Sequence, residues 1–377
     1  MIAPADIEVR AVPRLKIVIA VAACAVLGAG CGTGASATPG RAAQPSVIQT
    51  PGRLASSVVA SAPTPTGRAF TYQQMSVGFV SAGTASPWLA SNLASFKETA
   101  TQEGITLHVA AATAPDLASQ LTALSSFTAD PTINVIVLDP VQTTGYDDAL
   151  RAAKLVGKIV IVEDGPIDSD PSLYAARVAA DFVAEGQKAG EAMCALLGAS
   201  AHKNVVEIGG DPSSPRSIDR AAGFREKGGE CGVQVVATPN AVGPDPAAGK
   251  AILQGLLAQS RDIQGVFAYD DEQAHGAIEA IRAAGLTPGK DIMVVGITNQ
   301  PIECQAESDG LKDLLSGDLG ADIGYNPMLA PQVYDTALEV LNGVAALPKW
   351  ITVPEGSMLA SYGAGAILAG RCPSSKH

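Results

Sequence analysis

The 377-residue chain has few charged residues, few aromatic residues and little cysteine or histidine. Charged residues make up 16%, and acids outnumber bases by 37 to 25, so a phosphate backbone would repel the chain and nucleic acid is a poor partner. Six cysteines do not make a disulfide scaffold at this length. The hydrophobic fraction of 47% excludes a disordered protein, and the length predicts two domains behind a targeting segment.

Motifs of catalysis and cofactor binding are also missing. Residues 243–250 read GPDPAAGK, with five residues between the glycines and Ala251 where a phosphate loop needs Ser or Thr. No GxSxG nucleophile motif occurs, and the four histidines have no metal-binding spacing. We therefore predict no enzyme, no cofactor and no metal site. The alternative, an exported α/β enzyme, would need a nucleophile–base pair or a metal cluster.

The N-terminus has the three parts of an export signal. Basic residues precede an apolar run at 17–27, and small residues lead to Cys31. The run is too short to span a bilayer. A cysteine directly after small residues resembles the lipidation motif of bacterial lipoproteins, so residues 1–30 are predicted to be a signal peptide and Cys31 to carry lipid. Cys24 is the alternative lipidation site, and a plainly cleaved signal or an uncleaved anchor remains open.

Residues 31–74 are rich in Gly, Ala, Ser, Thr and Pro and poor in large apolar residues. Such a segment cannot bury enough surface to fold, and it is predicted to be a flexible tether between the lipid and the folded part. The protein is therefore expected outside the cytoplasm, anchored to the cell membrane by lipid only.

From residue 76 onward, short apolar runs alternate with Ala-rich amphipathic stretches, a pattern typical of parallel sheets with helices on both faces. Ten strands are too many for one such sheet, so we predict an α/β fold of two doubly wound parallel-sheet lobes. The predicted strands are 76–80, 106–110, 135–138, 159–162, 174–178, 205–208, 233–238, 265–268, 292–296 and 322–325.

Polar residues follow many of these strands, at the sheet edge where α/β folds bind ligands. Asp164 directly follows a predicted buried strand, so its side chain is expected in a cleft between the lobes. The acids from Asp270 onward begin a helix; they predict a helix cap, a cap that also contacts ligand, or a cation site.

Four stretches together resemble the type I periplasmic sugar-binding proteins, especially the galactofuranose-binding branch of the ribose-binding group. They are AADFVAEGQKAG (179–190), SSPRSIDRAAGF (213–224), VFAYDDEQAHGAIEAIRAAGLTPGKDIMVVGI (266–297) and YNPMLAPQVYD (325–335). The resemblance covers about 77–343, in matching order.

The resemblance implies two α/β lobes joined by a three-strand hinge and closing on one sugar or polyol. It implies lobe one at 75–180 plus 299–328 and lobe two at 181–298 plus 329–372. It also implies an ABC permease and its ATPase as partners, and a monomeric binding protein. A sensor that presents the sugar to a membrane receptor remains the alternative.

The resemblance further implies the ligand contacts. Trp88 falls where the family has a stacking aromatic, Asp164 matches an acid that ends the fourth strand, and Arg220 matches an arginine four residues before Phe224. The alternatives are that Trp88 packs on the core and that Arg220 is a solvated helix residue. Asp181 is predicted to bind ligand or cap a helix, and Asn326 to bind ligand or form a turn.

Several positions depart from the family pattern. Leu89 and Gly165 replace arginines, Asp270 stands in place of an asparagine, Thr298 stands in place of an acid, and residues 244–245 fall where an aromatic is usual. The loss of two cations and the gain of an acid predict a more negative pocket. This puts galactofuranose itself in doubt and favours a neutral polyol or an amino sugar. Asp270 and Thr298 are still predicted to contact the ligand.

Four cysteines remain after the signal and Cys31. Because the first two share a predicted lobe and exported disulfides persist, we predict the pairs Cys194–Cys231 and Cys304–Cys372. Free buried thiols are the alternative.

Overall fold

The computed structural model describes residues 69–110, 115–241, 243, 245–298, 309–344, 347–353 and 355–362. The predicted signal peptide, Cys31, most of the tether, and the pair Cys304 and Cys372 lie outside these ranges. Within them, no helix combines the length and the apolar character needed to cross a bilayer.

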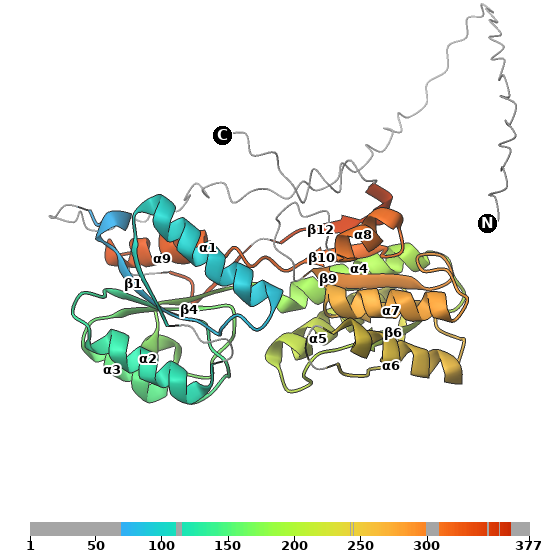
Figure 1. Ribbon diagram of the computed structural model, residues 1–377, viewed down its shortest axis with the longest axis horizontal. Helices are drawn as coiled ribbons and strands as arrows, with labels where there is room; N and C mark the ends of the chain where they lie inside the picture. Colours follow the sequence, from blue (N-terminus) through green and yellow to red (C-terminus); the bar gives the residue numbers. More distant parts are fainter. Residues whose placement is uncertain are drawn as a thin grey trace, which may run out of the picture. The chain divides into compact units, whose positions relative to one another are not determined.

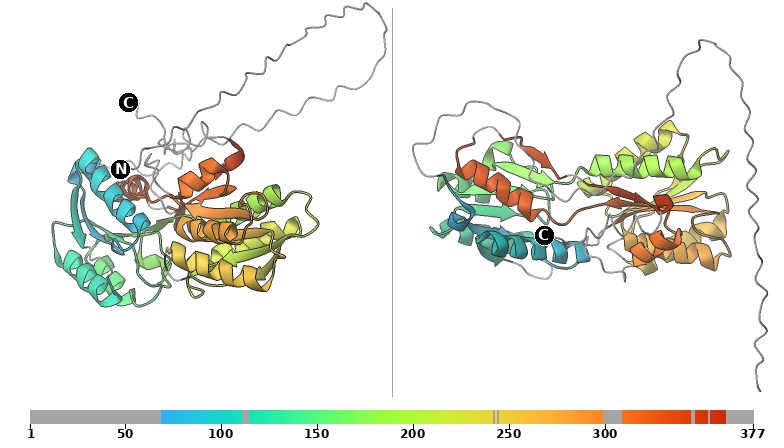
Figure 2. Two further views of the ribbon diagram at one scale, coloured as in Figure 1. Left: turned by 45° about the vertical axis from the view of Figure 1, so that its right-hand side comes forward. Right: turned by 90° about the horizontal axis from the view of Figure 1, so that it is seen from above.

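The first lobe is built on a six-stranded parallel sheet of order β11-β5-β4-β3-β1-β2. Helices α1 and α9 cover one face, and α2 and α3 cover the other (Figures 1 and 2). The strands are β1 (Ser76–Val80), β2 (Thr106–Ala110), β3 (Val135–Leu138), β4 (Ile159–Glu163), β5 (Ala176–Ala179) and β11 (Trp350–Thr352). The helices are α1 (Pro87–Glu103), α2 (Leu117–Ala129), α3 (Asp147–Leu155) and α9 (Ala330–Leu341).

The second lobe is built on a six-stranded sheet of order β12-β10-β9-β8-β6-β7, parallel except for the edge strand β12. Helices α4 and α5 pack together on one face, and α6, α7 and α8 lie on the other. The strands are β6 (Asn204–Ile208), β7 (Gln234–Ala237), β8 (Gly265–Ala268), β9 (Met293–Thr298), β10 (Ala321–Gly324) and β12 (Ser357–Leu359). The helices are α4 (Phe182–Leu197), α5 (Pro215–Glu230), α6 (Pro246–Gln259), α7 (Asp271–Ala283) and α8 (Asp309–Ser316).

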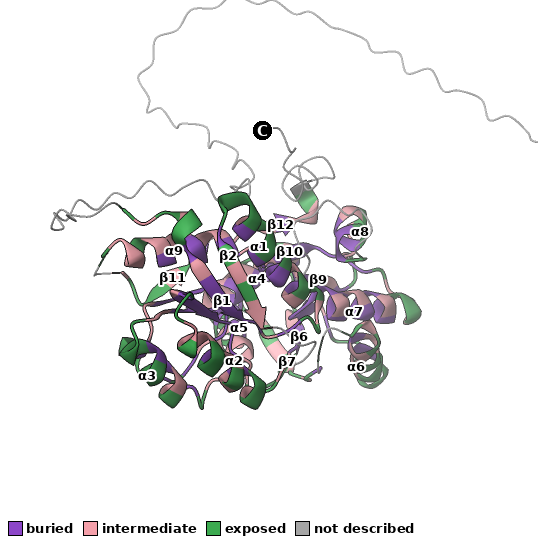
Figure 3. Cartoon of the chain, turned by 60° about the vertical axis from the view of Figure 1, so that its left-hand side comes forward, coloured by how far each residue is buried: buried purple, intermediate pink, exposed green. Residues whose placement is uncertain are grey.

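The prediction of two parallel-sheet lobes is therefore confirmed. Each of the ten predicted strands overlaps an observed strand. Two three-residue edge strands, β11 and β12, were missed, because so short a run carries no readable alternation of apolar and polar residues. Central strands such as β3 are apolar throughout since helices cover both faces of the sheet. Figure 3 shows the neighbouring strand β1 largely buried.

The chain passes between the two sheets three times: from β5 to α4, from β10 to α9, and from β11 to β12. This pattern corrects the predicted lobe boundaries at the C-terminal end. Strand β10 pairs with β9 and so belongs to the second lobe, not the first. Helix α9 packs against β4 and β11 pairs with β5, so both belong to the first lobe. Strand β12 pairs with β10 in the second lobe, as predicted. The other C-terminal elements were assigned to the wrong lobe because a local pattern does not show which sheet a strand joins.

Glycines allow α4 and α5 to approach closely. A Cβ atom at Gly186 would lie 2.1 Å from the carbonyl oxygen of Arg220, and one at Gly223 would lie 2.0 Å from the carbonyl oxygen of Val183. A larger residue at either position would therefore force the helices apart. This contact fixes Arg220 against the first turn of α4.

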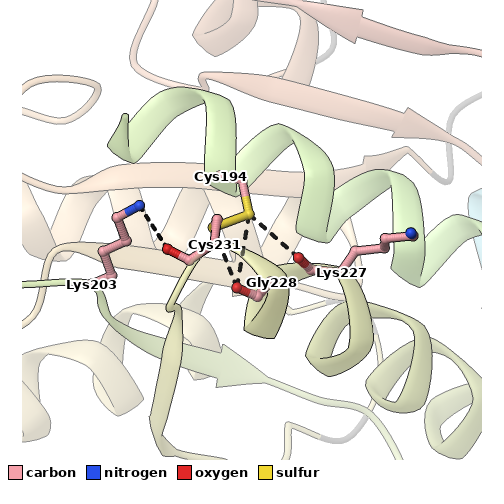
Figure 4. The surroundings of a disulfide bond; sticks show 5 residues. All are labelled: Cys194, Lys203, Lys227, Gly228 and Cys231. Atoms are coloured by element: carbon pink, nitrogen blue, oxygen red, sulfur yellow. Dashed lines mark hydrogen bonds between the residues drawn. A yellow bond between two sulfur atoms is a disulfide. The ribbon is translucent and has the colours of Figure 1, made fainter. Parts of the chain in front are cut away.

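A disulfide between Cys194 and Cys231 joins the ends of the same two helices (Figure 4). The Lys203 ammonium donates a hydrogen bond of 2.9 Å to the carbonyl oxygen of Cys231. The first predicted cysteine pair is thus confirmed, and the chain between the two cysteines forms a closed loop that spans a sequence separation of 37.

We expect the double variant Cys194→Ser, Cys231→Ser to lower the free energy of unfolding by up to about 4 kcal/mol, because the open loop gains entropy in the unfolded chain. Urea denaturation followed by circular dichroism measures the loss. A double variant as stable as the wild type would contradict a stabilising role for this bond.

Candidate functional site

Trp88, Asp164 and Arg220 come from different elements, and Tyr325 connects them. Trp88 lies in the first turn of α1, which Ser86 caps, and its ring stacks on that of Tyr325 with centroids 4.7 Å apart. Its indole N–H donates to the carbonyl oxygen of Tyr325 over 3.2 Å. With 4% of its surface exposed, Trp88 is largely covered by protein. Trp88 therefore packs on the β10–α9 crossover, and its contact with a ligand stays a prediction.

Asp164 directly follows β4, as predicted, and is fully buried. It is the one non-glycine residue with positive φ (54°) in the part of the chain that the structure describes. The Tyr325 hydroxyl donates to Oδ1 over 2.7 Å, and the Arg216 guanidinium pairs with Oδ2. Arg177 donates to the Asp164 carbonyl oxygen from Nε over 3.0 Å and from Nη2 over 2.6 Å. Groups from three other elements thus hold both the carboxylate and the backbone of Asp164.

Arg220 is buried and paired. Its Nε donates to Glu185 Oε2 over 2.7 Å, and its guanidinium lies 4.8 Å from the ring centroid of Tyr325 and 5.3 Å from that of Phe182. Burial alone would lower its pKa, but Glu185 and Tyr325 outweigh burial and raise it. A charged, planar donor stacked on aromatic rings suits recognition of paired hydroxyls.

Two further acids lie near Asp164. Burial, followed by the charge of Asp164, raises the pKa of Asp139 to about 8. Burial, followed by the charge of Asp139, raises the pKa of Glu163 well above its usual range. The raised pKa values favour the protonated form of both carboxyls, and a protonated carboxyl can donate as well as accept a hydrogen bond.

Two acids of this group are paired with arginines. Asp164 is paired with Arg216 and Glu185 with Arg220, while burial raises the pKa of both Asp139 and Glu163. The expectation of a more negative pocket counted the arginine lost at position 165. It did not count Arg216, which pairs with Asp164, and it stays a prediction.

The other predicted residues make local bonds. Asp181 caps α4 by accepting from the Ala184 N–H over 3.0 Å, and Asp270 caps α7 by accepting from the Gln273 N–H over 2.7 Å. Burial raises the pKa of Asp270 to about 8. Asn326 Oδ1 accepts from the Met328 N–H over 2.9 Å, which forms a turn at the β10–α9 crossover. Thr298 is half-buried at the end of β9. Their contacts with a ligand stay predictions.

Sequence reasoning missed Arg216, Tyr325 and Phe182. All three lie within the stretches that carry the family resemblance, but the sequence analysis assigned none of them a role in the site. Arg216, in the first turn of α5, reads locally as a solvated helix residue. Its ion-pair partner, Asp164, belongs to the first lobe and is identified only by the tertiary structure. Among the residues that the structure describes, no group of three or more His, Cys, Asp or Glu side chains is arranged to hold a metal ion.

Comparison with known proteins shows where this architecture recurs. The family model for a periplasmic binding protein domain matches residues 77–343. The galactofuranose-binding protein YtfQ of Escherichia coli (strain K12) is 30% identical, over 75% of this chain and 87% of its own length. The ribose import binding protein RbsB of Bacillus subtilis (strain 168) is 28% identical, over 59% of this chain and 67% of its own length.

Solved structures are similar over most of the chain. The periplasmic binding component of the arabinose ABC transporter from Shewanella sp. ANA-3, bound to α- and β-L-arabinofuranose, is 30% identical with a TM-score of 0.68. The match covers 79% of this chain and 96% of that one. A Mycobacterium smegmatis protein in complex with β-D-fucofuranose is 30% identical with a TM-score of 0.66, over 80% of this chain and 94% of that one.

The raised pKa of Asp139 makes stability depend on pH. Its carboxyl ionises near 4 when unfolded and at about 8 when folded, so the folded state binds more protons in between. The stability that the neutral carboxyl contributes is therefore lost as pH rises from about 4 to about 8. Asp139→Asn keeps an oxygen for the Ala82 N–H, which now donates to Asp139 Oδ2, but carries no charge.

From pH 5 to pH 9, we expect the stability of Asp139→Asn to rise relative to the wild type by roughly 2–5 kcal/mol. Urea denaturation at both pH values measures the change. The exposed Asp147→Asn is the matched control and should show no such difference. Parallel pH profiles for Asp139→Asn and the wild type would contradict the prediction.

Proposed function

Because the chain belongs to the periplasmic binding protein family, we propose that it is an extracytoplasmic solute-binding lipoprotein that captures a neutral sugar and delivers it to an ABC importer. The observation that carries the proposal is the network around Tyr325, which joins Trp88 and Asp164 of the first lobe to Arg220 of the second. The family is one of binding proteins, so the importer would supply the ATP hydrolysis.

These residue types suit a sugar ligand. An aromatic face packs on the C–H side of a sugar ring, and charged planar groups bond pairs of its hydroxyls. Since both oxygens of Asp164 are engaged by Tyr325 and Arg216, a sugar hydroxyl that binds there must share or displace one of them. A hydroxyl that shares or displaces the Tyr325 bond changes the environment of Trp88 through its stack on Tyr325. Ligand binding is also linked to movement about the hinge. A ligand that contacts both lobes stabilises the closed population.

The substrate class we propose is a neutral pentose or hexose in its furanose form. Relatives at about 30% identity are described with arabinofuranose, fucofuranose and galactofuranose. The ion pairs of Asp164 and Glu185 favour a neutral ligand over an amino sugar or a sugar acid, because both acids already have a charged partner and an added charge in a buried site would lack one. A neutral hydroxyl can use both the donors and the protonated acids of the site.

Trp88 is one of two tryptophans in the chain, which allows a direct test. In the variant Trp350→Phe, which removes the half-exposed tryptophan of β11, all tryptophan emission comes from Trp88. We expect titration with L-arabinose, D-galactose or D-fucose to change this emission with a saturable dependence on concentration. Saturation at 100 times the dissociation constant should also stabilise the protein by about 2.7 kcal/mol.

In the same background, Arg220→Gln should weaken binding by roughly 10- to 100-fold, since it removes a charged hydrogen-bond donor. The exposed Arg151→Gln is the control and should bind as the parent does. If no neutral sugar changes either the emission or the melting temperature, the sugar-binding proposal is wrong.

The lipid anchor has its own test. We expect Cys31→Ser to release the exported protein from the membrane fraction, because the thiol that would carry the lipid is lost. Cys24→Ser is the matched control and should remain with the membrane. Fractionation of cells that express each variant distinguishes the two sites, and the reverse result would assign the lipid to Cys24.

A further inference from the structure

The Arg216–Asp164 ion pair joins the two lobes. Arg216 lies in the first turn of α5 in the second lobe, and Asp164 lies at the end of β4 in the first. The Arg216 side chain is one-third exposed, and its guanidinium lies 5.9 Å from the ring centroid of Phe182. Its Nε is buried and has no hydrogen-bond partner among the residues that the structure describes. One part of the guanidinium is thus committed to Asp164, while Nε can still donate.

The residue after Asp164 explains how Arg216 reaches this place. Gly165 has no side chain, and a Cβ atom there would lie 3.2 Å from Nη2 of Arg216 and 3.0 Å from Cγ of Pro140. A long side chain at position 165 would compete with Arg216 for the space beside Asp164. The glycine therefore leaves room for a cation that arrives from the opposite lobe.

We propose that Arg216 is a specificity-determining and lobe-closing residue: it supplies from the second lobe the cation that position 165 lacks, so that Asp164 is neutralised only when the lobes are together. This inference rests on the proposed sugar-binding function and adds a residue to the site. Arg216 orients Asp164 for the ligand and donates through Nε to a ligand oxygen.

Arg216 can favour closure because it is attached to the lobe opposite Asp164. An arginine beside Asp164 on the same lobe would pair with it whether the lobes are open or closed. An arginine on the other lobe pairs with it only in the closed arrangement, because opening separates the two groups and exposes both to water. The attraction therefore favours closure, and a ligand bound to Asp164 and Arg216 adds to the same equilibrium.

The first experiment measures closure without any ligand. Small-angle X-ray scattering should give a larger radius of gyration for Arg216→Gln than for the wild type, while Arg151→Gln, a surface arginine of the first lobe, should leave it unchanged. The double variant Gly165→Arg, Arg216→Gln should remain expanded, because its arginine no longer bridges the lobes. An unchanged radius for Arg216→Gln overturns the lobe-closing role.

The second experiment measures affinity in the Trp350→Phe background, with L-arabinose, D-galactose and D-fucose as probes. Arg216→Gln should weaken binding by roughly 10- to 100-fold, and Gly165→Arg, Arg216→Gln should recover part of this loss by returning a cation to Asp164. Wild-type affinity in Arg216→Gln overturns the ligand-binding role. If no probe binds the parent protein, the proposed function fails instead, and the scattering result still decides the lobe-closing role.

Discussion

The buried carboxylate of Asp164 is the group on which the site depends. A charge in the protein interior is costly unless it is paired and hydrogen-bonded, and Asp164 meets that requirement with groups from three other elements. Tyr325 comes from the β10–α9 crossover, Arg216 from α5, and Arg177 from β5. Since Tyr325 also stacks on Trp88, the position of one carboxylate sets the arrangement of the aromatic residues as well.

A second group of polar residues lies where the chain passes between the lobes. Glu185 is in the first turn of α4, Asn326 follows β10, and Glu355 precedes β12, so each of the three crossovers contributes one of them. The Asn326 N–H donates to Glu355 Oε1 over 2.9 Å. Burial and the neighbouring Glu185 raise the pKa of Glu355 well above its usual range. The crossovers are therefore joined by polar contacts that tie them to Arg220, the partner of Glu185.

The acids of the site are compensated in a way that the acidic composition of the whole chain does not suggest. Four acids, Asp139, Glu163, Asp164 and Glu185, are buried there in a chain whose net charge is -12. Burial raises the pKa of Asp139 and Glu163, and two arginines of α5 pair with Asp164 and Glu185. A site of this kind offers many donors and acceptors, which suits a ligand made of hydroxyl groups.

The sequence by itself determined the α/β class, the ten longer strands, the Cys194–Cys231 pair and the prominence of Asp164. Each of these follows from local pattern or chain order: apolar runs bounded by turn residues, two cysteines in one lobe, and an acid directly after a buried strand. The tertiary structure alone decided that β10 belongs to the second lobe and α9 to the first, and that Arg216 meets Asp164 across the lobes. Sheet membership and long-range ion pairs depend on which distant segments approach one another, and no local pattern records that approach.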